Sequence, residues 1–364
     1  MSLRAGPGAR ACDRFYSFHE SRCSTDAFGE ARSRVDAAPR GAEVPDSTLG
    51  SGRGAAVQLR RGLRIGLAVV AAAGAGRAVR GQSIEPRLFS NAPVGLNFVI
   101  VGYAHSSGGV VLDASIPLED AKIKINAPFI AYARSLDVAK RSAQIQFLVP
   151  YAWLSGEAVL TSTGEVRTRD VNGFGDPSLR FALNLHGAPA LPLAEFPGYK
   201  QDLVVGVSLQ ITAPLGQYDP DRLVNLGTNR WTFKPEFGFS KALGRWILEG
   251  TGAANLYTDN ADFFGGQHRS QDPIYSAQGH VIYICPRGTW AALDATYYTG
   301  GRSTVDGVEG EDLQRNWRTG LTLALPVNRR NSIKFYVSEG VYTRVGDDFV
   351  LGGVGWQHRW GGGI

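Results

Sequence analysis

The sequence predicts an all-β protein, an antiparallel transmembrane β-barrel of the bacterial outer membrane with about 12 strands. Three observations predict this fold. Apolar and polar side chains alternate with a period of two along most of residues 82–364, the alternating segments are about 9–14 residues long, and long and short connections alternate along the chain. A period of two is the signature of strands whose two faces meet different surroundings.

Alternation is clearest in residues 143–153, where Ile145, Phe147 and Val149 share one face and Gln144 and Gln146 share the other. The same pattern recurs along the chain and yields an even number of candidate strands. Seven of the twelve segments are 96–106, 121–134, 143–153, 178–186, 203–215, about 232–240 and 349–360. The other five contain the alternating residues of 246–255, 278–283, 293–297, 317–325 and 333–338.

The length of these segments favours a membrane barrel over a soluble sandwich. Strands of globular proteins average about 5–6 residues, whereas a tilted strand needs about 9–11 residues to cross a bilayer. Aromatic residues near the strand ends suit the girdles at the two membrane interfaces. These residues are Trp153, Trp231, Trp246, Tyr257, Trp290, Tyr297, Trp317, Trp356 and Trp360.

The connections agree with a barrel whose two termini lie on the periplasmic side. Short turns follow even-numbered strands, and long polar connections such as 157–175 and 258–272 follow odd-numbered ones. Bacterial barrels have short periplasmic turns and longer outer loops. Two connections depart from the rule: 187–201 is long after an even strand, and 345–348 is short after an odd one.

The first 81 residues differ from the rest of the chain. Residues 57–81 have an arginine-rich head, a short apolar run and small residues at the end, as in a secretory signal peptide. Residues 1–56 are rich in Arg, Ala, Gly and Ser, which predicts disorder. The only Met is Met1, so we interpret 1–56 as an extension upstream of the true start, at Val57 or Leu59. The apolar run 65–75 is too short to span a bilayer.

The basic charge belongs to this leader. Residues 1–81 hold 13 Arg and 7 acidic residues, which leaves 25 basic and 26 acidic residues in 82–364. The barrel part is therefore close to neutral, and the charge gives no reason to expect a nucleic-acid partner. Segment 82–95, which contains Pro86 and Pro93, is expected to lie in the periplasm or inside the lumen rather than to form a barrel strand.

Several stretches together resemble a known family. They are "EPRLFSNAPVGLNFVIVGYAHSSGGV" after the leader, "GFGDPSLRFALNL" at the fourth strand and "APLGQYDPDRLVNLGTNRWTFKPEFGFSKALGRW" further on. The set resembles the bacterial outer-membrane family named for the meta-pathway of phenol degradation, whose members are often called simply transporters. The resemblance implies a barrel and a role in uptake of aromatic or hydrophobic small molecules, and it carries over no catalytic residues. Turn chemistry also explains Gly173, Gly175, Asp176 and Pro177.

The polar face of the strands supplies the candidate functional residues, which we expect to line the lumen. Charges of both signs in a narrow barrel either pair across strands as a structural network or line a selective path. Both interpretations stay open. The candidates are Lys122, Lys124, Arg134, Arg180, Lys234, Glu236, Glu249, His280, Asp294, Arg318 and Lys334.

No pattern predicts catalysis, a metal site or a cofactor. His105 and Ser106 are adjacent, but no third residue of a hydrolase triad has a suggestive spacing. A single cysteine, Cys285, in residues 82–364 excludes an intramolecular disulfide framework there. The expected partners are outer-membrane lipid and lipopolysaccharide, a small solute, and the barrel-assembly machinery, which would recognise the C-terminal strand.

The sequence therefore predicts a channel or transporter-like barrel in the outer membrane, for passive uptake of small aromatic or hydrophobic solutes. The alternative is a barrel without a transport role, either a structural or surface-interaction protein or a lipid-modifying enzyme.

Overall fold

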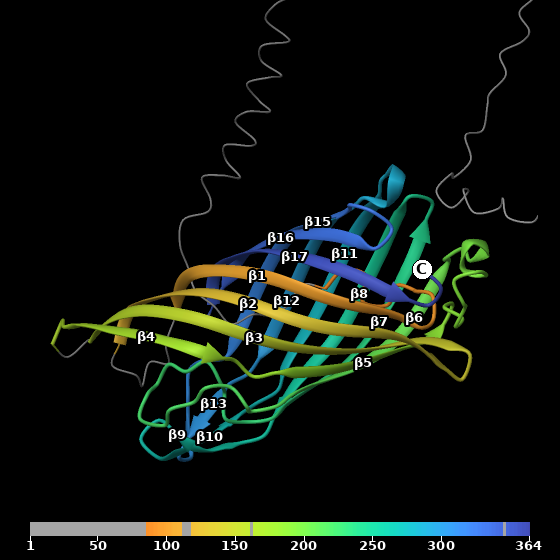
Figure 1. Ribbon diagram of the computed structural model, residues 1–364. Coiled ribbons are helices and arrows are strands. Elements are labelled where there is room, and N and C mark those ends of the chain that lie inside the picture. Colours follow the sequence, from red (N-terminus) through yellow and green to blue (C-terminus); the bar gives the residue numbers. More distant parts are fainter. Residues whose placement is uncertain (1–84, 111–117, 161–162, 345–346) are drawn as a thin grey trace, which may run out of the picture. The chain divides into compact units, whose positions relative to one another are not determined.

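The computed structural model describes residues 85–110, 118–160, 163–344 and 347–364. The predicted extension 1–56 and signal peptide 57–81 lie outside these residues. The described part is all-β: one closed antiparallel barrel and a small separate sheet, joined by turns and loops (Figure 1). No helix in this part is long and apolar enough to cross a membrane.

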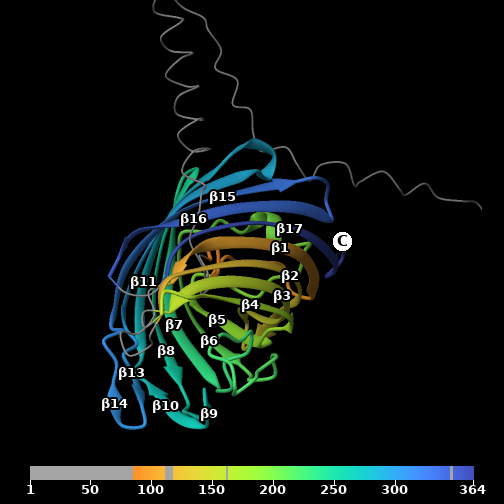
Figure 2. The same cartoon turned by 90° about the vertical axis from the view of Figure 1, so that its left-hand side faces the viewer.

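The barrel closes because every strand has a hydrogen-bonded neighbour on both sides. The ring runs β2, β1, β17, β16, β15, β12, β11, β8, β7, β6, β5, β3 and back to β2, and Figure 2 views this ring from one end. Twelve positions confirm the predicted number. Their bounds are β1 Leu96–Val110, β2 Leu118–Val138, β3 Arg141–Leu160, β5 Ser178–His186, β6 Leu203–Thr212, β7 Thr232–Leu243, β8 Trp246–Tyr257, β11 Ile274–Ile284, β12 Trp290–Gly300, β15 Gln314–Pro326, β16 Asn331–Thr343 and β17 Asp347–Gly361.

The fourth barrel position has two parts. β4 (Val166–Phe174) pairs with residues 151–159 of β3, toward the end of the barrel with the long loops. β5 pairs with residues 143–148 of β3, toward the end with the short turns. Gly175, Asp176 and Pro177 separate them, so the predicted turn interrupts a single barrel position. β2 and β3, with 21 and 20 residues, exceed the predicted length. They continue as a paired ribbon beyond the roughly 9–11 residues that cross a bilayer.

The connections follow the predicted alternation. Two-residue turns at Ala139–Lys140 and Gly244–Arg245 join β2 to β3 and β7 to β8. At the opposite end, the long connections form a four-stranded sheet of β9 (Asn260–Phe263), β10 (Gln267–Gln271), β13 (Ser303–Val305) and β14 (Val308–Glu309) (Figure 1). The short-turn end, where the described chain also ends, is the periplasmic end by the rule for bacterial barrels.

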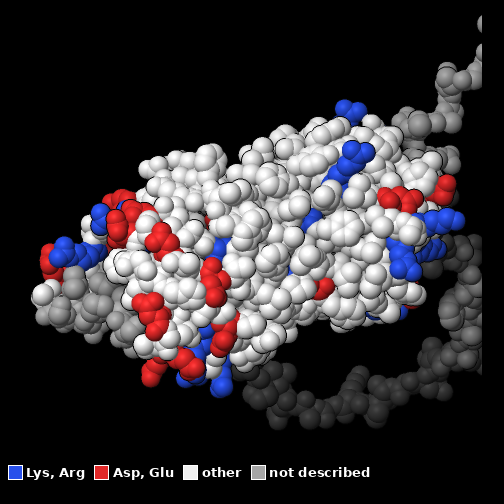
Figure 3. All heavy atoms as spheres, turned by 90° about the horizontal axis from the view of Figure 1, so that it is seen from below, with Lys and Arg blue, Asp and Glu red and all other residues white. Residues whose placement is uncertain are grey.

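The outer surface of the barrel is apolar between two charged ends. Figure 3 shows charged side chains gathered toward the ends, with a largely uncharged surface between them. Large apolar side chains such as Ile130, Phe237 and Leu293 are 52 %, 57 % and 56 % exposed. Such a surface is suited to lipid rather than to water.

The predicted aromatic girdle holds with exceptions. Six tryptophans lie exposed on the outer face: Trp153, Trp231, Trp246, Trp317, Trp356 and Trp360. Trp290 instead faces inward with Ala292 and Asp294, where the guanidinium carbon of Arg87 lies 5.6 Å from its ring centroid. Tyr257 lies under the guanidinium of Arg230, 4.2 Å from it. Proximity to a strand end therefore did not decide which face an aromatic residue occupies.

Candidate lumenal site

Eight of the predicted lumenal residues lie on the inward face of the barrel. They alternate with exposed apolar side chains, so that Leu293 points out and its neighbour Asp294 points in. They come from β5, β7, β8, β11, β12, β15 and β16. The eight are Arg180, Lys234, Glu236, Glu249, His280, Asp294, Arg318 and Lys334.

The other three predicted residues require a correction. Lys122, Lys124 and Arg134 share a face of β2 with the exposed Ile130 and Tyr132, so they lie on the outside of the barrel. The Lys122 Nζ lies 3.9 Å from Glu157 Oε1 on β3, and both side chains are more than half exposed.

The error comes from judging a face by polarity alone. Lys122 and Lys124 lie where β2 has continued beyond the apolar belt, and there an outward side chain meets water. The inward face of β2 beside these lysines is apolar, with Ala121, Ile123 and Ile125. Further along the strand, the inward Phe129 fills the space over Gly102. A side chain at Gly102 would place its Cβ 2.2 Å from the Phe129 ring. Inward residues here pack against the wall instead of meeting solvent.

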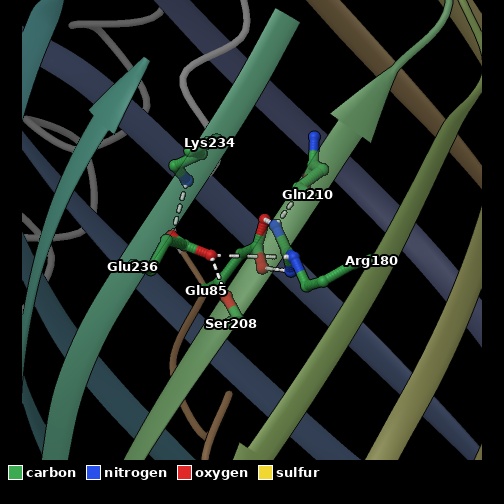
Figure 4. Close-up of polar contacts among 6 residues, drawn as sticks. All are labelled: Glu85, Arg180, Ser208, Gln210, Lys234 and Glu236. Atoms are coloured by element: carbon green, nitrogen blue, oxygen red, sulfur yellow. Dashed lines mark hydrogen bonds and ion pairs between the residues drawn. The ribbon is translucent and has the colours of Figure 1, made fainter. Parts of the chain in front are cut away.

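Arg180 is the centre of a buried ionic cluster (Figure 4). Its guanidinium forms a two-pronged contact with the carboxylate of Glu85 and also donates to Gln210 Oε1. The Arg180 Nε lies 3.7 Å from Glu236 Oε2. The Arg180 side chain is 8 % exposed, so this charge is held by partners rather than by water.

Glu236 joins this arginine to a second cation. The Lys234 Nζ lies 2.8 Å from Glu236 Oε1, and Ser208 Oγ donates to Glu236 Oε2 at 2.6 Å. The register explains the assembly, because Arg180, Gln210 and Lys234 are directly opposite one another on β5, β6 and β7. One carboxylate from the wall and one from Glu85 thus balance two wall cations.

Glu249 holds the backbone of the segment that precedes β1. The Arg87 N–H donates to Glu249 Oε2 at 2.6 Å, and Ser240 Oγ donates to Glu249 Oε1 at 2.8 Å. Gln201 Nε2 donates in turn to Ser240 Oγ at 2.8 Å. Both carboxylate oxygens are therefore occupied in a residue that is 8 % exposed.

A histidine–aspartate pair lies further round the wall. His280 Nδ1 is 2.7 Å from Asp294 Oδ1, and Thr322 Oγ1 donates to Asp294 Oδ2 at 2.9 Å. The two side chains are 1 % and 0 % exposed. On the next strands, Arg318 Nη2 donates to Ser338 Oγ at 2.8 Å, and the Arg318 guanidinium lies 3.6 Å from the Phe349 ring centroid.

The described residues before β1 lie against the inner wall. Phe89 is 3 % exposed and packs with Ala188 and Val204. Two inward glycines make room for its ring: Cβ atoms added at Gly206 and Gly238 would lie 2.3 and 2.6 Å from it. With the contacts of Glu85 and Arg87, this packing holds Glu85–Phe89 to β5, β6, β7 and β8.

The long connection 187–202 anchors the same segment at the periplasmic end. Val94 N–H donates to Leu191 O at 2.9 Å, and Asn91 Nδ2 donates to Pro189 O at 3.1 Å. Ser142 N–H also donates to Ala188 O at 3.0 Å, which ties the connection to β3. The length of this connection, unexplained by the loop rule, thus corresponds to its role as a support for residues 91–94.

Sequence reasoning missed Glu85, Arg87 and Phe89 as parts of this site. A signal was present in Gly206 and Gly238, which interrupt inward positions of adjacent strands. An inward glycine in a strand marks close approach of another chain segment. What the sequence lacked was any indication of which segment approaches, because its contacts span 95 and 162 residues of chain.

Asp176, predicted as a turn residue, also binds the connection between β6 and β7 through hydrogen bonds. It accepts a hydrogen bond from Gly216 N at 2.9 Å on one oxygen. Its other oxygen accepts from the Thr228 N–H and hydroxyl, each at 2.8 Å. Gly216 and Gly227 permit the close approach, since a Cβ at either would lie 2.7–2.8 Å from backbone atoms. The two family-like motifs are therefore one tertiary unit.

The adjacent His105 and Ser106 do not form a catalytic pair. They point to opposite faces of β1: His105 is exposed and contacts Asn126 at 2.9 Å, while Ser106 is buried and donates to Val350 O at 3.2 Å. Within the described residues, no group of three His, Cys, Asp or Glu side chains is arranged to hold a metal ion.

Comparison with known families gives one match that covers most of the barrel. The model of the family described as "Putative MetA-pathway of phenol degradation" matches residues 104–357. The chain belongs to this family. The matched range includes the whole barrel except the beginning of β1 and the end of β17. No curated protein matches the sequence.

Three solved structures of outer-membrane barrels are similar to this member of the phenol-degradation family to different degrees. The COG4313 outer membrane channel from Pseudomonas putida F1 is 24 % identical, with a TM-score of 0.65 over 76 % of this chain and 100 % of that chain. The transport unit of the Escherichia coli autotransporter AIDA-I gives 9 % identity and a TM-score of 0.46, covering 76 % and 93 %. The beta domain of the Bordetella autotransporter BrkA gives 9 % and 0.43, covering 73 % and 100 %.

The fold and its surface give the location of this phenol-degradation family member. A closed antiparallel barrel with an apolar outer belt is the form in which bacterial proteins cross the outer membrane. The protein shares that fold with an outer-membrane channel. It is an outer-membrane barrel in contact with outer-membrane lipid.

Proposed function

We propose that the protein is a passive outer-membrane channel for small aromatic or hydrophobic solutes, with residues 85–95 narrowing its lumen. The observation that carries the proposal is the polar inner wall. A barrel with only a structural role needs an outer face suited to lipid. An exposed charge on its inner wall, such as Lys334, adds nothing to the stability of such a barrel. Interiors of barrels of about 12 strands are large enough to leave a narrow passage.

The solute class rests on likeness rather than on geometry. The family is named for phenol degradation, and the barrel of similar fold from Pseudomonas putida is described as an outer membrane channel. The family name supports an aromatic solute, and the similar fold supports a channel. The proposal includes no catalytic residue.

Single-channel recording tests the transport role. Refolded protein in planar bilayers is expected to conduct weakly, because Glu85–Phe89 occupies part of the lumen. The double variant Glu85→Gln/Phe89→Ala removes the contact with Arg180 and the packing under β6 and β7, so we expect a severalfold larger conductance. The matched control is Glu157→Gln/Phe174→Ala on the outer face. No conductance by wild type or variant, with no influx of phenol into proteoliposomes, would refute a channel.

Two partners follow from the same proposal. The exposed loops at the outer end face the lipopolysaccharide layer. Strand β17, whose outward side chains include Val354, Trp356 and Trp360, is the segment that the barrel-assembly machinery would recognise. Cross-linking through a cysteine placed at Trp360 during assembly in cells tests the second contact.

A further inference from the structure

The inward charges are matched by partners with one exception. Of the eight predicted residues that face inward, seven make a hydrogen bond or ion pair described above. Lys334 on β16 makes no hydrogen bond or ion pair with any residue that the structure describes. Its ammonium nitrogen lies 6.0 Å from the ring centroid of Tyr336, the next inward residue of the strand.

Lys334 is exposed to solvent although it lies on the inward face. Its neighbours along the strand, Ile333 and Phe335, point to lipid, and the inward Ser338 is buried. Water therefore reaches a space inside the barrel beside Lys334. This contrasts with Arg180 and His280, whose side chains are packed away from solvent.

Glycines on β17 shape this space. Gly355 pairs directly with Lys334, and Gly353 pairs with Tyr336. A Cβ added at Gly353 would lie 2.3 Å from the hydroxyl end of the Tyr336 ring, so that end of the ring lies over the glycine. Gly355 is buried, and a Cβ added there would have only Ile100 within 4 Å, at 3.7 Å, so a small space without side-chain atoms, the recess, lies over this glycine. An amine, a phenol ring and a recess thus adjoin one another.

Asp294 lies on β12, two strands from Lys334, and its two oxygens already bind His280 and Thr322. The Tyr336 hydroxyl likewise has no hydrogen-bond partner among the described residues. The recess therefore offers an ammonium and a phenolic hydroxyl that have no hydrogen bond to any described residue, and both can donate to an anion.

We propose that Lys334 and Tyr336 form a lumenal binding site for the carboxylate of small aromatic acids. The ammonium binds the carboxylate, and the aromatic body lies in the recess between Tyr336 and Gly355. This inference deepens the proposed function by naming an anionic aromatic solute, and it rests on that function for its biological meaning.

Equilibrium binding to detergent-solubilised, folded protein provides the test, with sodium benzoate as the probe and neutral benzyl alcohol as its uncharged counterpart. Saturation-transfer NMR measures both. We expect Lys334→Met to weaken benzoate binding about tenfold, as loss of one charge-assisted hydrogen bond would. Benzyl alcohol binding should change little. Lys334→Arg should restore most benzoate binding, and the control Lys124→Met on the outer face should match wild type.

A second pair of variants tests the recess without touching the charge. Gly355→Val fills the wall opposite Lys334, whereas Gly352→Val adds the same side chain to the outward face, where a Cβ meets nothing within 4 Å. We expect benzoate binding to fall with Gly355→Val and to persist with Gly352→Val. Folding is checked by heat-modifiable electrophoretic mobility.

Equal benzoate affinity in wild type, Lys334→Met and Gly355→Val would overturn the site. Failure of the proposed function has a different signature. Lys334-dependent benzoate binding without conductance or solute influx would leave the site standing and remove the channel. Conductance together with benzoate binding that does not depend on Lys334 would support the channel and remove the binding site.

Discussion

Individual charges inside the barrel differ sharply in their surroundings from those outside it. Glu236 is 3 % exposed at its side chain and faces two cations, whereas Glu157 is 57 % exposed and faces one. A buried ion that loses its partner keeps its desolvation cost, while an exposed pair is screened by water. An ion pair inside the barrel therefore contributes differently to the free energy of unfolding from an ion pair on the outer face.

Glu236→Gln tests this difference. The change leaves Arg180 and Lys234 with one carboxylate, Glu85, instead of two. We expect a loss of about 3–5 kcal/mol in the free energy of unfolding. Urea titration followed by tryptophan fluorescence in detergent measures it. The control Glu157→Gln should cost less than about 1 kcal/mol, and equal losses in both variants would contradict a buried cluster.

Gly206→Ala tests the packing of Phe89. The added methyl would lie 2.3 Å from the Phe89 ring and 2.9 Å from Asn184 Oδ1, so the ring must move. We expect a loss of about 1–3 kcal/mol from overpacking, together with increased conductance. Gly252→Ala on the outer face, where a Cβ meets nothing within 4 Å, serves as the control. Unchanged conductance would show that the position of the Phe89 ring does not limit the passage of ions through the lumen.

At the scale of elements, connections between strands act as supports for one another. The connection 187–202 holds residues 91–94, and Asp176 holds the connection between β6 and β7. The latter also contacts the small sheet, where Tyr218 donates to Asp262 O at 3.0 Å. Loops of this kind are positioned by specific side chains rather than by their own regular structure.

Asp176→Ala should release the connection between β6 and β7. It removes three hydrogen bonds, which together hold Gly216 and Thr228 to the turn before β5. We expect trypsin to cleave after the exposed Arg222 severalfold faster in folded protein. Asp170→Ala, on the exposed face of β4, provides the matched control. Cleavage rates equal to wild type would show that Asp176 acts only within its own turn.

For the whole molecule, closure is the property on which every strand depends. β17 pairs with β1 along fifteen residues and with β16 along nine. Without β17, β1 and β16 would both become open edges in lipid, where unpaired backbone groups are costly.

Truncation tests closure directly. A chain lacking residues 347–364 should give no heat-modifiable folded species in detergent, whereas a chain lacking only 362–364 should still fold. Electrophoresis of unheated and heated samples distinguishes the two. A folded product from the longer truncation would show that the remaining strands close without β17.

The strand class, the twelve positions, the alternation of connections and the eight inward residues can be predicted from the sequence, because they follow from the two-residue pleat and from chain length. Lys122, Lys124 and Arg134 were placed on the wrong face because polarity alone does not mark the lumen. The contact of Glu85 with Arg180, the position of Phe89 under Gly206 and the lack of a described hydrogen-bond partner for Lys334 emerge only from the folded chain. Those contacts join residues far apart in the chain, and closure of the barrel, rather than any local pattern, brings them together.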